Sequence, residues 1–423
     1  MNRNNCIQVF EHGKLTTDDL RLKKRHLDAL IKLNELHGFE YFDIIHNGIK
    51  FKQYVGVIQV DGLTIEIHPK ADKNDEDGRW KGVLLQMLRE CGKLKVQTIG
   101  AANVKRQNLN LLEVYFELYL RELQSLIHKG LVKKYRKDTK NVNALKGKLE
   151  FAGNIRHNLV HKERFYTTHQ IYDTNHLLHQ VLFEALQIVN QFSKGTSIYD
   201  KCKRILLDFP EVNSIKVSVQ ELDKIKLNRK TQVYSYALEL ARLIILNYSP
   251  DISGGKEKMI SLLFDMNQLW EEYVLVKLRG YAREVYPNLI IIGQDSAAFW
   301  KDSSTNYSRF IKPDIVIKNG KETFIVDTKW KRPSNQNASI EDIRQMYVYN
   351  RFWDSKKSML LYPGNAPSSK KGIYHDQINN NDHSCLLGFV SVVKKIKYEE
   401  KESFILNDEI AKNIFDLLGE DFN

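Results

Sequence analysis

The stretch KPDIVIKNGKETFIVDTK, residues 312–329, carries the strongest structural signal in this sequence. Two runs rich in β-branched residues flank an Asn-Gly pair at 319–320, which is typical of a two-residue hairpin turn. The pattern predicts two antiparallel strands, with Asp314 opening the first and Asp327 ending the second. Both carboxylates then lie at the open end of the hairpin, and Lys329 points to the same side because side chains alternate along a strand.

Two carboxylates and an amine at one end of a sheet suit metal-assisted hydrolysis of a phosphodiester. Mg²⁺ prefers hard oxygen ligands and keeps several waters, one of which can become the nucleophile. An ammonium group can stabilise the charge of the transition state or help to orient the attacking water. The hairpin therefore favours a metal-dependent nuclease site; the alternative is a surface hairpin with ordinary charges.

A long helix is expected upstream, over about residues 257–285. In its segment FDMNQLWEEYVLVKL, residues 264–278, Glu271 shares a face with apolar side chains, whereas Glu272 turns toward the polar face and is expected in solvent. Carboxylates are rarely buried without a partner, and a metal or Lys329 could supply one. Glu271 is thus a further candidate acid of the site; the alternative is a partly buried structural acid.

Downstream, Gln345 and Tyr349 are four residues apart in a helix expected near 339–352, so they lie one turn apart on the same face. They could brace the active-site strand or contact the DNA backbone. An ordinary capped amphipathic helix explains the spacing almost as well.

The chain divides into three expected segments, which makes the fold class α+β and multidomain. Residues 1–105 form a module with two helices, over 18–37 and 80–91, and a hairpin of 51–60 and 63–69 that turns at an Asp-Gly pair. Residues 106–250 are mainly helical, over 111–127, 176–192 and 231–247, with a basic stretch at 129–151. After the breaker cluster at 249–258, residues 251–423 form an α/β domain with strands at 289–292, 313–318, 322–327, 358–362 and 386–392.

The charge of the chain points to a polyanionic partner. It has 423 residues and a net charge of +12, and residues 101–170 alone carry 14 Lys and Arg against 6 Asp and Glu. A basic balance of this kind is typical of proteins that meet nucleic acid or an acidic protein surface.

Several classes of protein are excluded by missing patterns. The four cysteines, at 6, 91, 202 and 385, form no CxxC pair, and no segment has the length and apolarity of a signal peptide or a membrane span. We therefore expect a soluble protein of the reducing cytoplasm with no membrane partner. No phosphate-binding loop occurs, so the chain should not hydrolyse nucleotides itself. The histidines at 157, 161, 169, 176 and 179 are expected to be surface or core residues rather than zinc ligands.

A set of motifs in a fixed order resembles the McrC family, the nuclease subunits of 5-methylcytosine-specific McrBC restriction systems. The motifs of the last third are FDMN and WEEYV within 264–274, KPD at 312–314, VDTKWK at 326–331 and QMYVY at 345–349. Earlier motifs are VGVIQV at 55–60, LTIEIHPK at 63–70, NALKGKLEF at 143–151 and YDTNH at 172–176. Trp330 is a departure, because another aromatic residue is common at this position of the family.

The resemblance implies a C-terminal PD-(D/E)xK restriction-endonuclease-like domain that cuts double-stranded, modified DNA. Carried onto this sequence, it makes Asp314 and Asp327 the Mg²⁺ ligands, Lys329 the catalytic amine and Glu271 a fourth member of the site. It also implies a partner, a McrB-like hexamer of AAA+ subunits that binds and hydrolyses GTP, recognises the modified DNA and is stimulated by the docked N-terminal half of this chain.

Two other functions are compatible with the same residues. The chain could be a regulatory adaptor that plugs and activates an AAA+ ring and has little nuclease activity. It could also bind DNA or RNA without a partner, in which case the isolated chain should bind tightly and with a strong dependence on salt.

Overall fold

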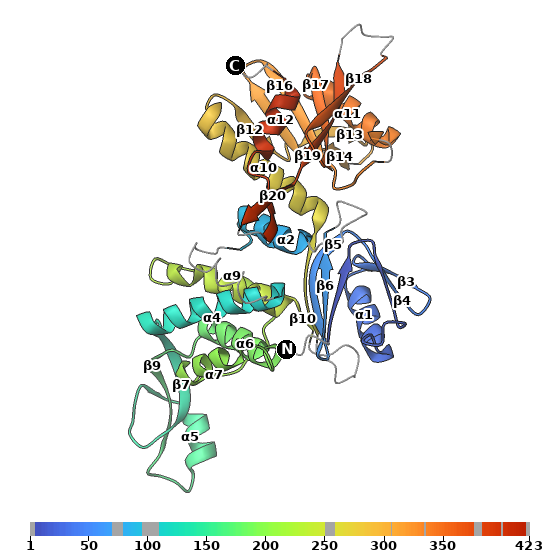
Figure 1. The fold of residues 1–423 in the computed structure, drawn as a ribbon. Helices are drawn as coiled ribbons and strands as arrows, with labels where there is room; N and C mark the ends of the chain where they lie inside the picture. Colours follow the sequence, from blue (N-terminus) through green and yellow to red (C-terminus); the bar gives the residue numbers. More distant parts are fainter. Residues whose placement is uncertain are drawn as a thin grey trace. The chain divides into compact units, whose positions relative to one another are not determined.

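The computed structural model describes residues 5–69, 79–94, 110–249, 259–305, 307–333, 336–375, 383–398 and 401–419. The chain packs as two compact units: Met1–Asn5, Ile58–Leu63 and Ala102–Leu262 form one, and Cys6–Val57, Thr64–Ala101 and Leu263–Asn423 form the other. Figure 1 shows helices in both units and several separate sheets. The expectation of a mixed, multidomain chain is confirmed, while the boundaries at 105 and 250 stay predictions.

A six-stranded sheet dominates the C-terminal part of the chain. Its order is β12 (Ile290–Gly293), β15 (Ile315–Asn319), β16 (Glu322–Thr328), β17 (Lys357–Gly364), β19 (Ser384–Ser391) and β18 (Ser368–Ile373). The central strands β16, β17 and β19 are parallel, whereas β12, β15 and β18 run antiparallel to their neighbours. The centre of the sheet is apolar and almost fully buried, as is typical of parallel strands covered on both faces.

Three helices pack on this sheet. Helix α10 (Met266–Val285) contacts β12, β16 and α12 (Ile410–Leu418), while α11 (Ile340–Phe352) contacts β16, β17 and β19. Helix α11 joins β16 to the parallel strand β17, so the three elements form a crossover unit. On the α11 face, Ile325 and Leu360 form a buried cluster with Met346 and Tyr349. This packing fixes α11 beside the end of β16.

The sequence prediction for the central hairpin is confirmed. Strands β15 and β16 are antiparallel, with Ile315 opposite Val326 and Asn319 opposite Glu322. Gly320 has a φ of 58°, the left-handed conformation that this turn requires and that glycine adopts without strain.

The long helix expected over 257–285 is wrong at its start. Residues Met259–Asp265 form strand β11, and α10 begins only at Met266. The side chain of Asp265 accepts hydrogen bonds from the backbone N–H groups of Asn267 and Gln268, so it caps the helix and ends the strand. The apolar run before this cap is buried in a sheet with the order β1-β6-β5-β11-β10.

The N-terminal hairpin is also confirmed, with β5 (Tyr54–Val60) and β6 (Leu63–His68) joined by Asp61 and Gly62, both at positive φ. Both faces of this hairpin are packed, because β6 is buried at every position. Strand β1 (Cys6–Phe10) pairs with β6 in parallel, and β10 (Tyr248–Ser249) pairs with β11.

A second small sheet has the order β2 (Lys14–Thr16), β4 (Gly48–Phe51) and β3 (Phe42–Ile45). The helices of this part are α1 (Lys24–Leu36), shorter than the expected 18–37, and α2 (Arg79–Glu90).

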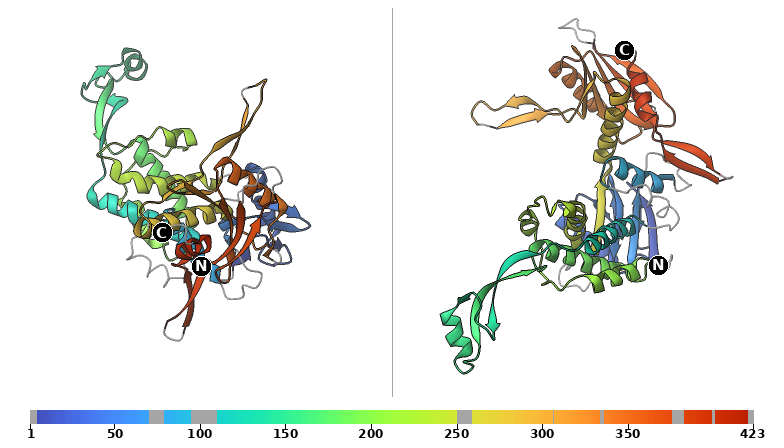
Figure 2. Two further views of the ribbon diagram at one scale, coloured as in Figure 1. Left: turned by 90° about the horizontal axis from the view of Figure 1, so that it is seen from above. Right: turned by 90° about the vertical axis from the view of Figure 1, so that its left-hand side faces the viewer.

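The middle of the chain contains the three expected helices, two further helices and a small sheet. The helices are α4 (Leu111–Lys129), α6 (Leu177–Phe192), α7 (Tyr199–Asp208), α8 (Val219–Asp223) and α9 (Ser235–Leu246), with a 3-10 turn, η2 (Gln232–Tyr234). Between α4 and α6 the chain forms a sheet of β7 (Lys134–Val142), β9 (Phe165–Asp173) and β8 (Lys148–Leu149), joined by helix α5 (Phe151–Asn158). We call residues 130–176 the arm. Figure 2 shows it reaching out from the helices in both views.

The region 106–250 is mainly helical, as expected, and the arm adds a small sheet to it. The strands of the arm are rich in charged and polar residues, because neither face of its sheet packs into a core. The alternation of apolar residues that marks a half-buried strand is therefore missing. The hairpins β13 (Ala297–Lys301) with β14 (Ser308–Ile311) and β20 (Val393–Tyr398) with β21 (Lys401–Leu406) also escaped prediction. Within the described ranges, no helix is long and apolar enough to cross a membrane.

Candidate active site

The hairpin register brings Asp314 and Asp327 to the same end of β15 and β16. Ile315 pairs with Val326, so the two aspartates occupy the next pair of positions. Thr328 holds Asp314 with two hydrogen bonds to Oδ2, from its backbone N–H at 2.7 Å and from its hydroxyl at 2.8 Å. Asp314 Oδ1 accepts no hydrogen bond from the described residues. Asp327 is only 1% exposed, although charged residues are seldom buried so completely.

Lys329 lies beside Asp327, as the alternation of side chains predicted. Its Nζ is 2.7 Å from Asp327 Oδ2 and 3.6 Å from Asp342 Oδ1, and it donates a hydrogen bond of 3.0 Å to Gln345 Oε1. Burial lowers the pKa of Lys329, but the Asp327 carboxylate outweighs burial, so the net change is upward. The amine therefore stays charged.

Glu271 joins this group from helix α10. It is half-buried, and its Oε1 accepts a hydrogen bond from Gln294 Nε2. Burial, and after it the nearby negative charge of Asp314, raises the pKa of Glu271 to about 7. Its place as a fourth member of the site stays a prediction. Glu272 points elsewhere and pairs with Lys93 at 3.0 Å.

Burial and like charge together raise the pKa of the two aspartates. Burial is the largest cause at Asp327, whose pKa rises to about 7, and the charge of Asp314 adds to it against the effect of Lys329. Burial also raises the pKa of Asp314, although the hydrogen bonds from Thr328 oppose the rise. Three acids thus face one amine, which leaves an excess of negative charge that a cation would neutralise.

Gln345 and Tyr349 brace the site from helix α11. Gln345 accepts from Lys329 and donates to Tyr349 Oη at 2.8 Å, and the Tyr349 hydroxyl donates to the Lys312 carbonyl at 2.9 Å. This chain of bonds ties the strand ahead of Asp314 to the amine after Asp327. For Gln345 and Tyr349, the sequence allowed either a bracing contact with the active-site strand, a contact with DNA or an ordinary amphipathic helix. The bracing contact is present.

Three contacts were not anticipated from the sequence. Asp342, in the first turn of α11, pairs with Lys331 at 2.6 Å, and Gln294 donates its backbone N–H to the Asp314 carbonyl at 2.8 Å. Trp330 is buried and donates its indole N–H to Glu11 Oε1 at 2.6 Å. The only signal for Asp342 was its place in the first turn of a helix, and no local pattern pairs Trp330 with a residue so far away in sequence.

The residues present fit a magnesium ion rather than a metal held by protein alone. Among the described residues, no three His, Cys, Asp or Glu side chains gather closely enough to hold a metal by themselves. Mg²⁺ commonly binds one or two carboxylates and takes its other ligands from water and substrate phosphate. Asp314 and Asp327 match that donor set, with Glu271 beside them.

The clustered histidines serve other purposes. His176 and His179 stack with ring centroids 4.1 Å apart, and each bonds a backbone carbonyl, of Val132 and of Thr174. Burial lowers the pKa of His179 to about 4, so it is neutral at physiological pH. The four cysteines are free.

Known proteins share both sequence and fold with this chain. The sequence model described as "McrBC 5-methylcytosine restriction system component" matches residues 49–363. A protein of Escherichia coli K12, described as type IV methyl-directed restriction enzyme EcoKMcrBC, is 20% identical over 286 residues, which cover 63% of this chain and 81% of that protein. A chain in the refined half-complex from the tetradecameric assembly of Thermococcus gammatolerans McrB AAA+ hexamers with bound McrC has a similar fold. Its TM-score is 0.70 at 19% identity, over 97% of this chain and 100% of that one.

Proposed function

Because this chain belongs to the family of McrBC 5-methylcytosine restriction system components, we propose that it is the Mg²⁺-dependent DNA endonuclease subunit of such a system. The observation that carries the proposal is the group of Asp314, Asp327 and Lys329 at the open end of one hairpin, with Lys329 Nζ 2.7 Å from Asp327 Oδ2. The fold supports a PD-(D/E)xK domain, since the antiparallel hairpin leads through α11 into parallel strands.

Each residue has a role in this proposal. Asp314 and Asp327 would hold Mg²⁺, which when bound acts as a Lewis acid and makes a coordinated water easier to deprotonate. Lys329 remains charged and stabilises the negative charge that develops on the phosphate. Glu271, whose pKa rises to about 7 through burial, suits the exchange of a proton with the attacking water at neutral pH. Gln345 and Tyr349 hold Lys329 and the strand that begins after Asp314 in position relative to each other.

We further propose that the chain works with a hexameric McrB-like AAA+ GTPase, which would bind the GTP, in the reducing cytoplasm. The E. coli and Thermococcus relatives carry the names of McrBC systems, and this chain has no phosphate-binding loop. The arm supports docking to such a ring, because it combines exposed lysines with exposed aromatic residues, Tyr135 and Tyr172. The DNA substrate would be double-stranded and modified.

The arm also favours a second candidate function, that of an adaptor that activates the ring. An arm that shares no core with the rest of its unit is built for contact with another molecule. The two functions are compatible. They differ in whether the nuclease site cuts DNA or has little activity.

The test is cleavage of methylated duplex DNA by the chain assembled with its GTPase, in the presence of GTP and Mg²⁺. We expect Asp327→Ala and Lys329→Ala to abolish cleavage while Lys321→Ala, at the far turn of the same hairpin, retains it. Unchanged cleavage in the Asp327 variant would reject the nuclease assignment and leave the adaptor.

A further inference from the structure

The hairpin of β13 and β14 exposes about half or more of each of four aromatic side chains. Phe299, Trp300, Tyr307 and Phe310 are 48%, 51%, 48% and 63% exposed. Such a concentration of exposed aromatic area on one small element is typical of a binding surface. Figure 2 shows this hairpin projecting from the six-stranded sheet in both views.

Cations lie among these rings. Trp300 is opposite Arg309 in the strand register, the Arg309 guanidinium lies 4.8 Å from the centre of the Tyr307 ring, and Trp300 meets Tyr307 edge-on. Lys301 is exposed at the end of β13. Neither Arg309 nor Lys301 pairs with a carboxylate among the described residues, so both are available to an anionic partner.

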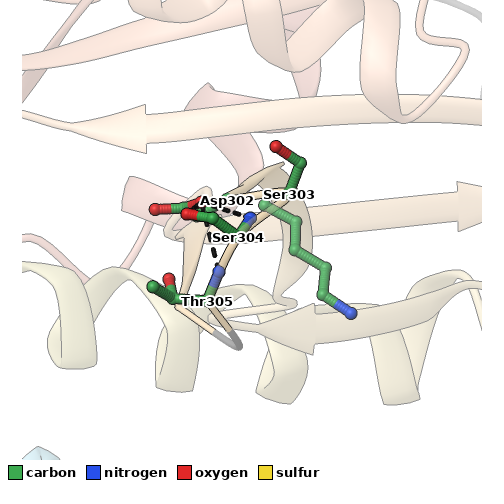
Figure 3. A pocket seen from close by; sticks show the side chains of 5 residues that line it. Asp302, Ser303, Ser304 and Thr305 are labelled. Carbon is green, nitrogen blue, oxygen red and sulfur yellow. Dashed lines mark hydrogen bonds between the residues drawn. The ribbon is translucent and has the colours of Figure 1, made fainter.

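The tip of the hairpin adds little negative charge to this surface. Its one acid, Asp302, accepts hydrogen bonds from Ser304 N, Ser304 Oγ and Thr305 N, as Figure 3 shows. The carboxylate is thus directed toward the backbone of its own turn. Over residues 297–312 the charges are Lys301, Arg309 and Lys312 against Asp302, so the hairpin is basic.

Both ends of the hairpin are joined to the candidate active site. Before β13, Gln294 donates its side-chain N–H to Glu271 and its backbone N–H to the Asp314 carbonyl. After β14, the Lys312 carbonyl accepts from Tyr349, two residues ahead of Asp314. The base is also packed, with the Phe299 ring 5.5 Å from that of Phe352. A molecule bound along the hairpin would therefore meet the carboxylates.

We propose that the β13–β14 hairpin binds the DNA duplex next to the phosphodiester to be cut. This inference rests on the proposed nuclease function and adds the surface that positions its substrate. A two-stranded ribbon has the width that a DNA groove admits. Arg309 and Lys301 contact the phosphates, and Trp300 and Phe310 pack against sugars and bases, which aromatic side chains do without requiring a particular sequence.

The experiment measures binding of the full chain to a short fluorescein-labelled DNA duplex by anisotropy, without divalent cations so that no DNA is cut. We expect Trp300→Ala with Phe310→Ala to weaken binding by roughly tenfold or more, and Trp300→Phe to restore most of the loss from Trp300→Ala. Arg309→Ala should weaken binding less and lower the slope of log K against log salt by about one, whereas Lys321→Ala should not.

The outcomes separate this inference from the proposed function. Wild-type affinity in the double aromatic variant, or no binding of the duplex by the wild-type chain, would overturn the hairpin assignment. Loss of binding to the GTPase with unchanged affinity for DNA would also overturn it, because the hairpin would then contact protein. The nuclease proposal is tested separately, by cleavage of DNA by the assembled complex and its loss in Asp327→Ala. None of these three binding outcomes affects that test. Unchanged thermal unfolding of the hairpin variants would show that the chain remains folded.

Discussion

The end of the β15–β16 hairpin and the arm both place charged residues on antiparallel strands, but they hold these charges in opposite surroundings. At the hairpin end, Asp327 is 1% exposed and its pKa rises to about 7 through burial. On the arm, Lys133 and Lys137 are exposed and meet no carboxylate among the described residues. Buried, coupled charges are suited to chemistry, whereas exposed charges act on association and are screened by salt.

The largest expected effect separates the two regions. Asp327→Asn keeps the shape of the side chain but removes its charge, so we expect cleavage by the assembled complex to fall by roughly 100- to 1,000-fold or more. Stimulation of the partner's GTPase should not change. Asp354→Asn, an exposed aspartate of the same unit, is the matched control. A loss of both DNA cleavage and GTPase stimulation would contradict this separation of roles, because the site would then serve assembly as well.

The arm should respond in the opposite way. Lys133→Glu with Lys137→Glu reverses exposed charge, so we expect association with the GTPase to weaken by roughly tenfold at low salt and by less at high salt. The measurement is surface plasmon resonance with the ring, and Lys216→Glu, an exposed lysine outside the arm, is the control. If these variants instead lost only DNA affinity, the arm would contact DNA and not the ring.

Stability should depend on pH through the buried carboxyls of the site. The pKa values of Asp327 and Glu271 are raised to about 7 by burial, so their protonated forms stabilise the fold. That stabilisation is complete below about pH 4, where the unfolded carboxyls are also protonated, and it is lost as the pH rises through about 7.

Thermal unfolding of the metal-free chain across this range checks the sign. We expect Asp327→Asn to remove part of the pH dependence and to stabilise the chain at alkaline pH by roughly 1–3 kcal/mol. Mg²⁺ should stabilise the wild type more than the variant. A wild-type melting temperature that rises steadily from pH 4 to 8 would contradict the raised pKa values.

The smallest effect is expected at Trp330, which links the hairpin end to Glu11. Trp330→Phe removes a hydrogen bond to a carboxylate while the ring remains packed against Trp270, so we expect a loss of about 1–3 kcal/mol in stability. Urea unfolding followed by the fluorescence of the remaining tryptophans, Trp80, Trp270, Trp300 and Trp353, reports it. Cleavage should fall only slightly, since Lys329 keeps its own partners; a loss as large as that of Asp327→Asn would make Trp330 part of the chemistry.

The difference between the two regions also explains what the sequence could predict. The β15–β16 hairpin was predictable because a short turn fixes the register locally, and register alone brings Asp314 to Asp327. The arm was not, because its strands face solvent and lack an apolar period. The contacts of Lys329 with Asp342 and of Trp330 with Glu11 were out of reach, since Asp342 and Glu11 come from segments whose packing depends on the whole fold. Helix α10 was extended too far because an apolar run ahead of a cap fits a strand as well as a helix.

The most direct test of the central claim is the binding of Mn²⁺, as a substitute for Mg²⁺, to the full chain followed by electron paramagnetic resonance. We expect that the wild type binds Mn²⁺, that Asp314→Asn with Asp327→Asn loses this binding, and that Asp354→Asn keeps it. Equal binding by the wild type and the double variant would contradict the assignment of these two aspartates as the metal site.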